Sequence, residues 1–135
     1  EHTKIEAYFK VYMGKVKKNH PILLSIINLN EKLKDLGIKL IVYSTPINIT
    51  EAKQEFNINN QYLINDKQFE ERIFDNIKII EEKLYTHNIP FLDLTFKIKD
   101  LKNFYDRDHN IKSEHINYIG RKFVAKELQK FIDIY

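Results

Sequence analysis

The densest group of side chains that could do chemistry lies near the C-terminus. Its members are Asp106, Asp108, His109, Ser113, Glu114 and His115. A general base needs a neutral imidazole, a carboxylate that orients it and a rigid mount. His115 stands two residues before Asn117, which can cap a helix, and a helix N-terminus disfavours the protonated ring. The pattern predicts that His115 is a general base at the entrance of the last helix.

Other interpretations of the same residues stay open. Asp106, Asp108 and Glu114 are all candidates for the acid that orients His115, and Asp106 with His109 forms an alternative pair. The alternative interpretation of His115 is an ordinary polar residue at a helix start, and that of His109 is a solvated loop residue. A metal site would use carboxylates and imidazoles of this kind, but their spacing matches no compact metal motif. We therefore expect a catalytic role and no metal.

A serine nucleophile is not evident in this chain. Ser44 follows an apolar run but lacks the glycine-rich elbow that exposes a nucleophilic serine. We therefore interpret Ser44 and Ser25 as structural residues. The sequence looks like the part of an acyl-transfer enzyme that carries the base without the part that carries the nucleophile.

Composition limits the class of protein. A chain of 135 residues corresponds to one domain at most, and 43% hydrophobic residues are enough for a core. The net charge of +3 is spread along the chain, which does not favour nucleic acid as a partner. The absence of cysteine excludes disulfides and thiolate metal sites. No apolar run is long enough to span a membrane.

Helical periodicity, together with residues that cap or break helices, predicts four helices. Residues 4–18, within an N-terminal segment 1–20, form an amphipathic pattern that His20 and Pro21 interrupt. Residues 21–36 follow, with Pro21 at the first turn and Gly37 as the C-terminal cap. A third helix is expected over 66–87 and a fourth after Asn117, with a polar excursion at 50–65. In the second helix the apolar residues step by 4, 3, 4 and 3; they are Ile22, Ile26, Leu29, Leu33 and Leu36. In the last helix the inward residues are expected to be Phe123, Val124, Leu128, Phe131 and Tyr135.

Two short apolar runs, 38–44 and 89–94, are predicted strands. The helix between them implies parallel pairing, and hence an α/β fold over 21–135. Two strands do not make a stable sheet of this class, which usually has about four to six. We therefore expect the sheet to be completed by an N-terminal part of the same protein or by a second copy.

The C-terminal block resembles a known family. The run from His115 to Leu128, His-Ile-Asn-x-x-Gly-x-x-x-Val-Ala-x-x-Leu in outline, resembles the last conserved block of the SGNH (GDSL-type) hydrolases. Residues 37–48 resemble the penultimate strand with its proline-containing exit, and 89–94 the final strand with Asp93. The Thr-Pro-Ile-Asn exit is most similar to the branch that modifies cell-surface polymers.

The resemblance implies a three-layer α/β/α domain with a parallel, flavodoxin-like sheet, of which residues 1–135 are the C-terminal portion. It implies a serine esterase or O-acyltransferase of the cell envelope, acting without a cofactor on acyl esters of a surface glycan or polymer. It is compatible with membrane association of the parent protein. Two departures stand against it: Lys112 occupies the position where the family usually has an Asp, and no Gly-Asp-Ser block is present. The alternative is a non-catalytic α/β module that binds a protein or a glycan.

Overall fold

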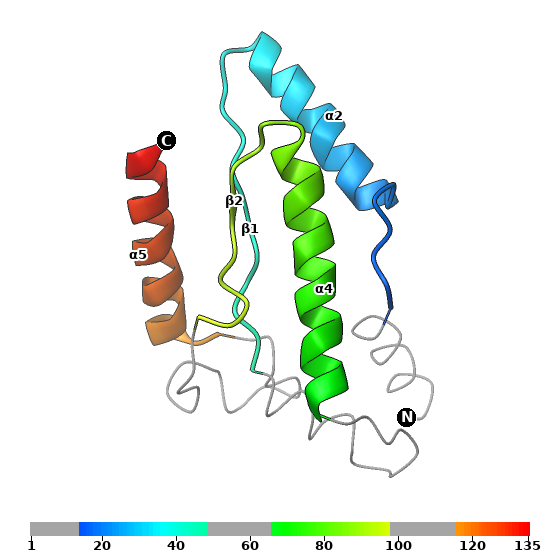
Figure 1. Cartoon of the computed structure of the whole chain (residues 1–135). Coiled ribbons are helices and arrows are strands. Elements are labelled where there is room, and N and C mark those ends of the chain that lie inside the picture. The colour runs from blue at the N-terminus through cyan, green and yellow to red at the C-terminus, as the bar shows by residue number, and fades with distance from the viewer. Residues whose placement is uncertain (1–13, 49–65, 98–115) are drawn as a thin grey trace, which may run out of the picture. The chain divides into compact units, whose positions relative to one another are not determined.

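The computed structural model describes residues 14–48, 66–97 and 116–135 (Figure 1). Within these ranges the chain mixes helices and strands. In chain order the elements are α2 (Pro21–Asp35), β1 (Val42–Tyr43), α4 (Asp66–Tyr85), β2 (Phe91–Leu92) and α5 (Tyr118–Ile134). The alternation of helix and strand agrees with the predicted α/β character. Residues 4–13 of the expected helix 4–18, and the excursion at 50–65, lie outside the described residues.

Helix α2 begins and ends as its sequence predicts. The His20 side chain accepts a hydrogen bond from the Ile22 backbone N–H at 3.3 Å, and Pro21 occupies the first turn, where its missing N–H is not needed. At the other end Gly37 adopts a left-handed φ of 70°. The N–H groups of Gly37 and Ile38 donate to the carbonyls of Lys34 and Leu33, each at 2.9 Å. This is a Schellman motif, which turns the chain sharply out of the helix.

Helix α4 ends in the same motif without a glycine. Asn88 takes the left-handed conformation, with φ 54°. Its N–H donates to Tyr85 and that of Ile89 donates to Leu84, each at 3.0 Å. Asparagine is among the few residues other than glycine that accept this conformation readily. Both strands therefore follow a helix through the same kind of turn.

Strands β1 and β2 are hydrogen-bonded neighbours in a two-stranded parallel sheet, which confirms the predicted parallel pairing (Figure 1). The Val42 N–H donates to the Pro90 carbonyl and the Ser44 N–H to the Leu92 carbonyl, each at 3.0 Å. The strands are much shorter than the predicted 38–44 and 89–94. The ladder ends early because the Leu94 N–H is bound by the Ser44 hydroxyl instead of by a strand carbonyl.

By its internal contacts the chain divides into two compact units. The first contains the described residues 14–42 and 66–91, and the second contains 43–48, 92–97 and 116–135. In the first unit α2 packs against α4 around a core of Leu23, Ile27, Leu84 and Ile89. Full burial of a side chain such as Leu84 contributes about 1.5–3 kcal/mol to folding.

The apolar stripe that predicts α2 is not its buried face. The buried residues are Leu23, Ile27 and Asn30, which lie beside that stripe on the helix surface. Of the stripe itself, Ile22, Leu29 and Leu36 remain 64%, 47% and 72% exposed. Ile26 and Leu33 of the stripe are half-buried, and Ile26 packs against the core. The buried face of α2 is therefore rotated from the predicted stripe and shares only its edge.

Residues 14–18, at the end of the predicted first helix, are not helical. The Asn76 side chain on α4 accepts a hydrogen bond from the Val16 N–H at 2.9 Å and donates to the Gly14 carbonyl at 2.7 Å. This amide pairs with the backbone as a strand would, and so satisfies groups that a helix would otherwise bond internally. Helical periodicity could not reveal this long-range contact.

In the second unit, the core is formed by the exits of both strands and by α5. Pro46, Leu94, Thr95 and Val124 are buried. Phe123, Leu128 and Phe131 are half-buried, in keeping with the predicted inward face of α5. Tyr135 was predicted to face inward but is 58% exposed, because it follows the last residue of α5 at the end of the chain. Its ring contacts the ring of Phe131, with 4.7 Å between the ring centres.

Candidate functional site

The carboxyl ends of the two strands are the place to look for a site, because ligands of open α/β sheets bind beyond those ends. Residues 43–48 and 92–97 leave the sheet there and belong to the same unit as α5. The two exits stay paired, since the Ile47 N–H donates to the Thr95 carbonyl at 3.1 Å.

The Ser44 hydroxyl makes three hydrogen bonds at this edge of the sheet. Its hydroxyl donates to Asp93 Oδ1 at 2.8 Å, and accepts from the Leu94 N–H at 2.9 Å and from the Thr95 hydroxyl at 2.8 Å. Asp93 Oδ1 also accepts from the Thr95 N–H at 2.9 Å, which makes an Asx turn. Four residues from two chain segments are thereby joined in one hydrogen-bonded cluster.

This geometry supports a structural role for Ser44. A nucleophilic serine gives its proton to a neighbouring base and keeps its oxygen open to the substrate. The Ser44 proton is instead directed at a carboxylate, and both acceptor positions of its oxygen are occupied. In the sequence, Ser44 lies at the end of one apolar run and Asp93-Leu94-Thr95 at the end of the other. Periodicity alone does not indicate that these two segments meet.

The entrance of α5 agrees with the sequence in detail. Asn117 is the N-cap, and its side-chain oxygen accepts a hydrogen bond from the Gly120 N–H at 3.0 Å. The Arg121 N–H donates to the Asn117 carbonyl at 2.9 Å, the first bond of the helix. The Arg121 guanidinium also donates to the Ile116 carbonyl at 3.1 Å. The backbone of Ile116 and Asn117 is therefore held by the first turn of α5.

The predicted catalytic residues themselves lie outside the described ranges. These are Asp106, Asp108, His109, Glu114 and His115, together with Lys112. The structure therefore describes the start of α5, which follows His115, and the carboxyl edge of the sheet. The imidazole of His115, its orienting acid and the alternative pair of Asp106 and His109 stay predictions.

On α5, the Glu127 carboxylate lies among lysine side chains that lower its pKa. A hydrogen bond from the Lys130 ammonium, at 2.6 Å, lowers the pKa of the Glu127 carboxyl, and the positive charges of Lys97 and Lys126 lower it further. Lys97 lies after β2 in the same unit as α5. Lys122 lies over the Tyr118 ring, 4.7 Å from its centre.

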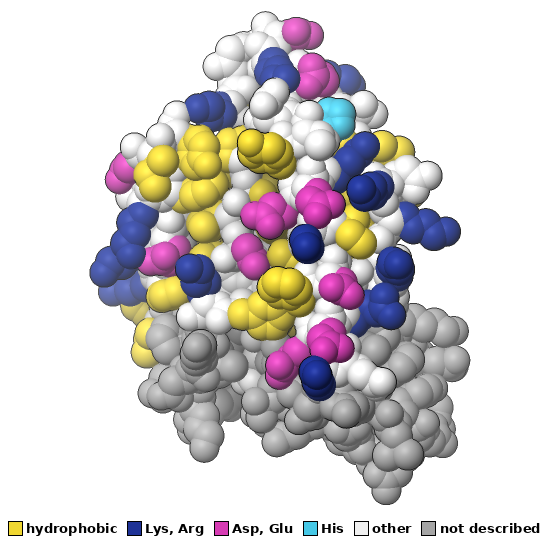
Figure 2. Space-filling view, in the orientation of Figure 1, with side chains coloured by type: hydrophobic (Ala, Val, Ile, Leu, Met, Phe, Trp, Pro, Cys, Tyr) yellow, Lys and Arg dark blue, Asp and Glu magenta, His cyan; other side chains and the backbone are white. Residues whose placement is uncertain are grey.

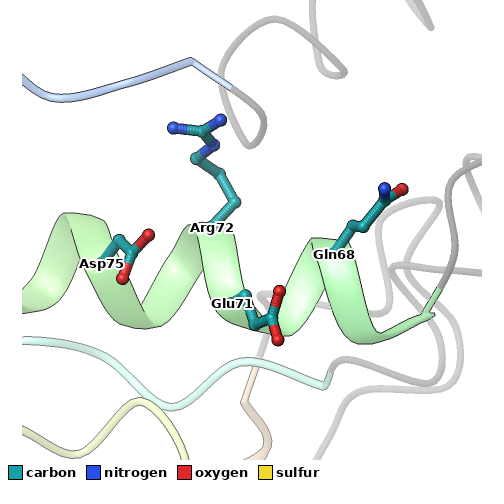
Figure 3. A pocket seen from close by; sticks show the side chains of 4 residues that line it. All are labelled: Gln68, Glu71, Arg72 and Asp75. Carbon is teal, nitrogen blue, oxygen red and sulfur yellow. The ribbon is translucent and has the colours of Figure 1, made fainter.

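A hollow on the first unit offers no better site. Its described lining comes from one face of α4 and consists of Gln68, Glu71, Arg72 and Asp75 (Figure 3). These side chains include no nucleophile beside a base. Acidic and basic side chains are interspersed over α4 on the face seen in Figure 2, so no block of one sign forms there.

Within 14–48, 66–97 and 116–135, no group of three or more histidine or carboxylate side chains is arranged to hold a metal ion. No helix in those ranges is long and apolar enough to cross a membrane. Comparison of the chain with protein-family models, curated proteins and solved structures gives no match.

Proposed function

We propose that this chain is the C-terminal part of an SGNH-like three-layer α/β domain and supplies the catalytic histidine of a serine esterase or O-acyltransferase. The observation that carries the proposal is the capped entrance of α5. Asn117 and Gly120 form the expected first turn directly after His115, in the unit that contains the carboxyl ends of both parallel strands.

In the proposed mechanism a serine from the rest of the domain attacks the acyl carbon. His115 takes the serine proton and then activates water or an acceptor hydroxyl. Asp106, Asp108 or Glu114 orients the imidazole. The positive end of α5 supports this role, because it disfavours the protonated ring and keeps the base neutral. No cofactor enters these steps.

The proposed substrate is an acyl ester of a surface glycan or polymer, which implies a cell-envelope location for the parent protein. Both rest on the family resemblance alone. The strands that complete the sheet are proposed to come from an N-terminal part of the same protein or from a second copy.

A second candidate function is a non-catalytic α/β module that binds a protein or a glycan. Lys112 favours it, because the family usually has an acid at that position. The engaged hydroxyl of Ser44 also favours it, since the described residues then contain no serine available at the strand ends.

The test compares two histidine variants in the full-length parent protein. We expect His115→Ala to lower the rate of acyl-ester hydrolysis or transfer by about a thousandfold or more, as loss of a triad base does. The matched control, His109→Ala, should cost far less. The reverse order would assign the base to Asp106 and His109. A parent protein with no activity above background would leave the binding module as the function, and full activity of both variants would overturn the assignment of the base to this chain.

A further inference from the structure

The outer edge of β1, which faces away from β2, is open in the described part of the chain. On the inner edge, the N–H groups of Val42 and Ser44 donate to carbonyls of the β2 segment, each at 3.0 Å. Successive N–H groups of a strand point to opposite edges, so those of Ile41 and Tyr43 point outward. Within 14–48, 66–97 and 116–135 no strand pairs with this outer edge. Such a row of backbone groups is a template for a further strand.

The composition of the two strands distinguishes their positions in a larger sheet. The run 38–44 around β1 contains one charged residue, Lys39, among β-branched and aromatic residues, which is typical of an interior strand of a parallel sheet. The run 89–94 around β2 contains Pro90 and Asp93, and both residue types are depleted in central strands. We therefore expect β1 to have a neighbour on each side and β2 to be the outermost strand.

Helices α2 and α4 cover the same face of β1. They contact each other, and Leu23 of α2 and Leu84 of α4 belong to one buried cluster. Leu40 and Val42 pack against that cluster. These two residues are alternate positions of one strand and therefore lie on the same face of the sheet. A helix that covers a parallel sheet is normally the crossover between two of its strands.

The handedness of crossovers decides on which side of β1 the further strand lies. Connections between parallel strands of one sheet are right-handed in about 98% of cases. Two right-handed crossovers with their helices on the same face move the chain across the sheet in the same direction. Helix α4 moves it from β1 to β2, so α2 moves it to β1 from the opposite side. The strand that precedes α2 therefore lies against the outer edge of β1.

We propose that the outer edge of β1 binds a strand from an N-terminal part of the parent protein, which runs parallel to β1 and is joined to the start of α2. The strand order is then this N-terminal strand, β1 and β2, with α2 as the first crossover helix. The inference rests on that part of the proposed function in which an N-terminal part completes the sheet. It selects the edge, the direction and the source, and it needs no catalytic residue.

Hydrogen exchange of single backbone amides, compared between the 135-residue chain and the full-length parent protein, tests the edge. We expect the Ile41 and Tyr43 N–H groups to exchange at least about a hundredfold more slowly in the parent, because they become part of a ladder. The matched internal control is the outer edge of β2, where the N–H groups of Phe91 and Asp93 point away from β1. Their exchange should be alike in the two proteins.

Three results would overturn the proposal. Slower exchange at Phe91 and Asp93 alone would place the added strand beside β2. Equal exchange of all four amides in both proteins would show that no strand joins either edge. Protection of Ile41 and Tyr43 that appears in the 135-residue chain as its concentration rises would assign the edge to a second copy. The measurement does not use ester hydrolysis, so an inactive parent with a protected β1 edge would refute the proposed catalysis and leave this inference in place.

Discussion

At the scale of single residues, Ser44 connects the two strand exits of the second unit. One hydroxyl satisfies a carboxylate, a backbone N–H and a second hydroxyl at the point where the parallel ladder stops. Loss of a partner from a buried hydrogen-bonded group costs more than the bond itself contributes, because the remaining group is left unsatisfied. Ser44 is therefore more important for stability than its exposed counterpart Ser25.

We expect Ser44→Ala to lower the free energy of unfolding by about 1–3 kcal/mol, because the Leu94 N–H and the Thr95 hydroxyl both lose their acceptor. Urea denaturation measures the change. Ser25→Ala is the matched control: Ser25 donates only to the Pro21 carbonyl of its own helix, and its loss should change stability by less than about 0.5 kcal/mol. Equal effects of the two substitutions would show that the cluster is not cooperative.

The lowered pKa of Glu127 predicts a loss of stability at acidic pH. Its pKa lies below the ordinary value of 4.5, chiefly because of the hydrogen bond from Lys130. A depressed pKa in the folded state contributes stability above the unfolded pKa, and that contribution is lost as the pH falls through the folded pKa. Lys130→Ala should raise the pKa of Glu127 towards 4.5, measured by NMR titration of its carboxyl group. An unchanged titration would contradict the assigned cause.

At the scale of elements, the two helix-to-strand turns are built alike from different residues. Gly37 and Asn88 occupy the same position of a Schellman motif, with φ 70° and 54°. A Cβ atom added at Gly37 would meet no atom within 4 Å, so space is not what requires glycine there. The requirement comes from the backbone conformation, which strains most side chains.

We therefore expect Gly37→Ala to destabilise the protein by about 1–2 kcal/mol, the cost of a left-handed alanine. Asn88→Ala should be destabilising in the same direction, whereas Asn88→Gly should stay close to the natural protein because glycine adopts this conformation without strain. Thermal and chemical unfolding of the three variants would test this. Destabilisation by Asn88→Gly as large as that by Asn88→Ala would mean that the asparagine side chain has a separate role.

At the scale of the whole molecule, the described sheet is small for its class. Two short parallel strands are paired with each other, and parallel sheets are normally larger and covered on both faces. The candidate base, the sheet edge and the structural serine all belong to this chain, and no available nucleophile has been found in its described part. Under the proposed function, activity requires a serine from a further part of the protein.

The 135-residue chain alone should not hydrolyse p-nitrophenyl acetate above the background rate, because the Ser44 hydroxyl is occupied. A spectrophotometric assay at neutral pH, with His115→Ala as the control for non-specific imidazole catalysis, measures this. Turnover that Ser44→Ala abolishes would show that Ser44 is the nucleophile after all, and that its hydrogen bonds rearrange in solution.

The sequence by itself determined the local structure. Pro21, Gly37, Asn88 and Asn117 marked the ends of the helices closely, since caps and turns depend on a few neighbouring residues. The parallel strands followed from two apolar runs separated by a helix. Only the tertiary structure decided which face of α2 is buried, that Asn76 holds residues 14 and 16 out of a helix, and that Ser44, Asp93 and Thr95 meet. The contacts of Asn76 and of Ser44 join groups about 50 to 60 residues apart in the sequence. The buried face of α2 depends on how α2 packs against α4. Helical and strand periodicity carries no information about contacts of either kind.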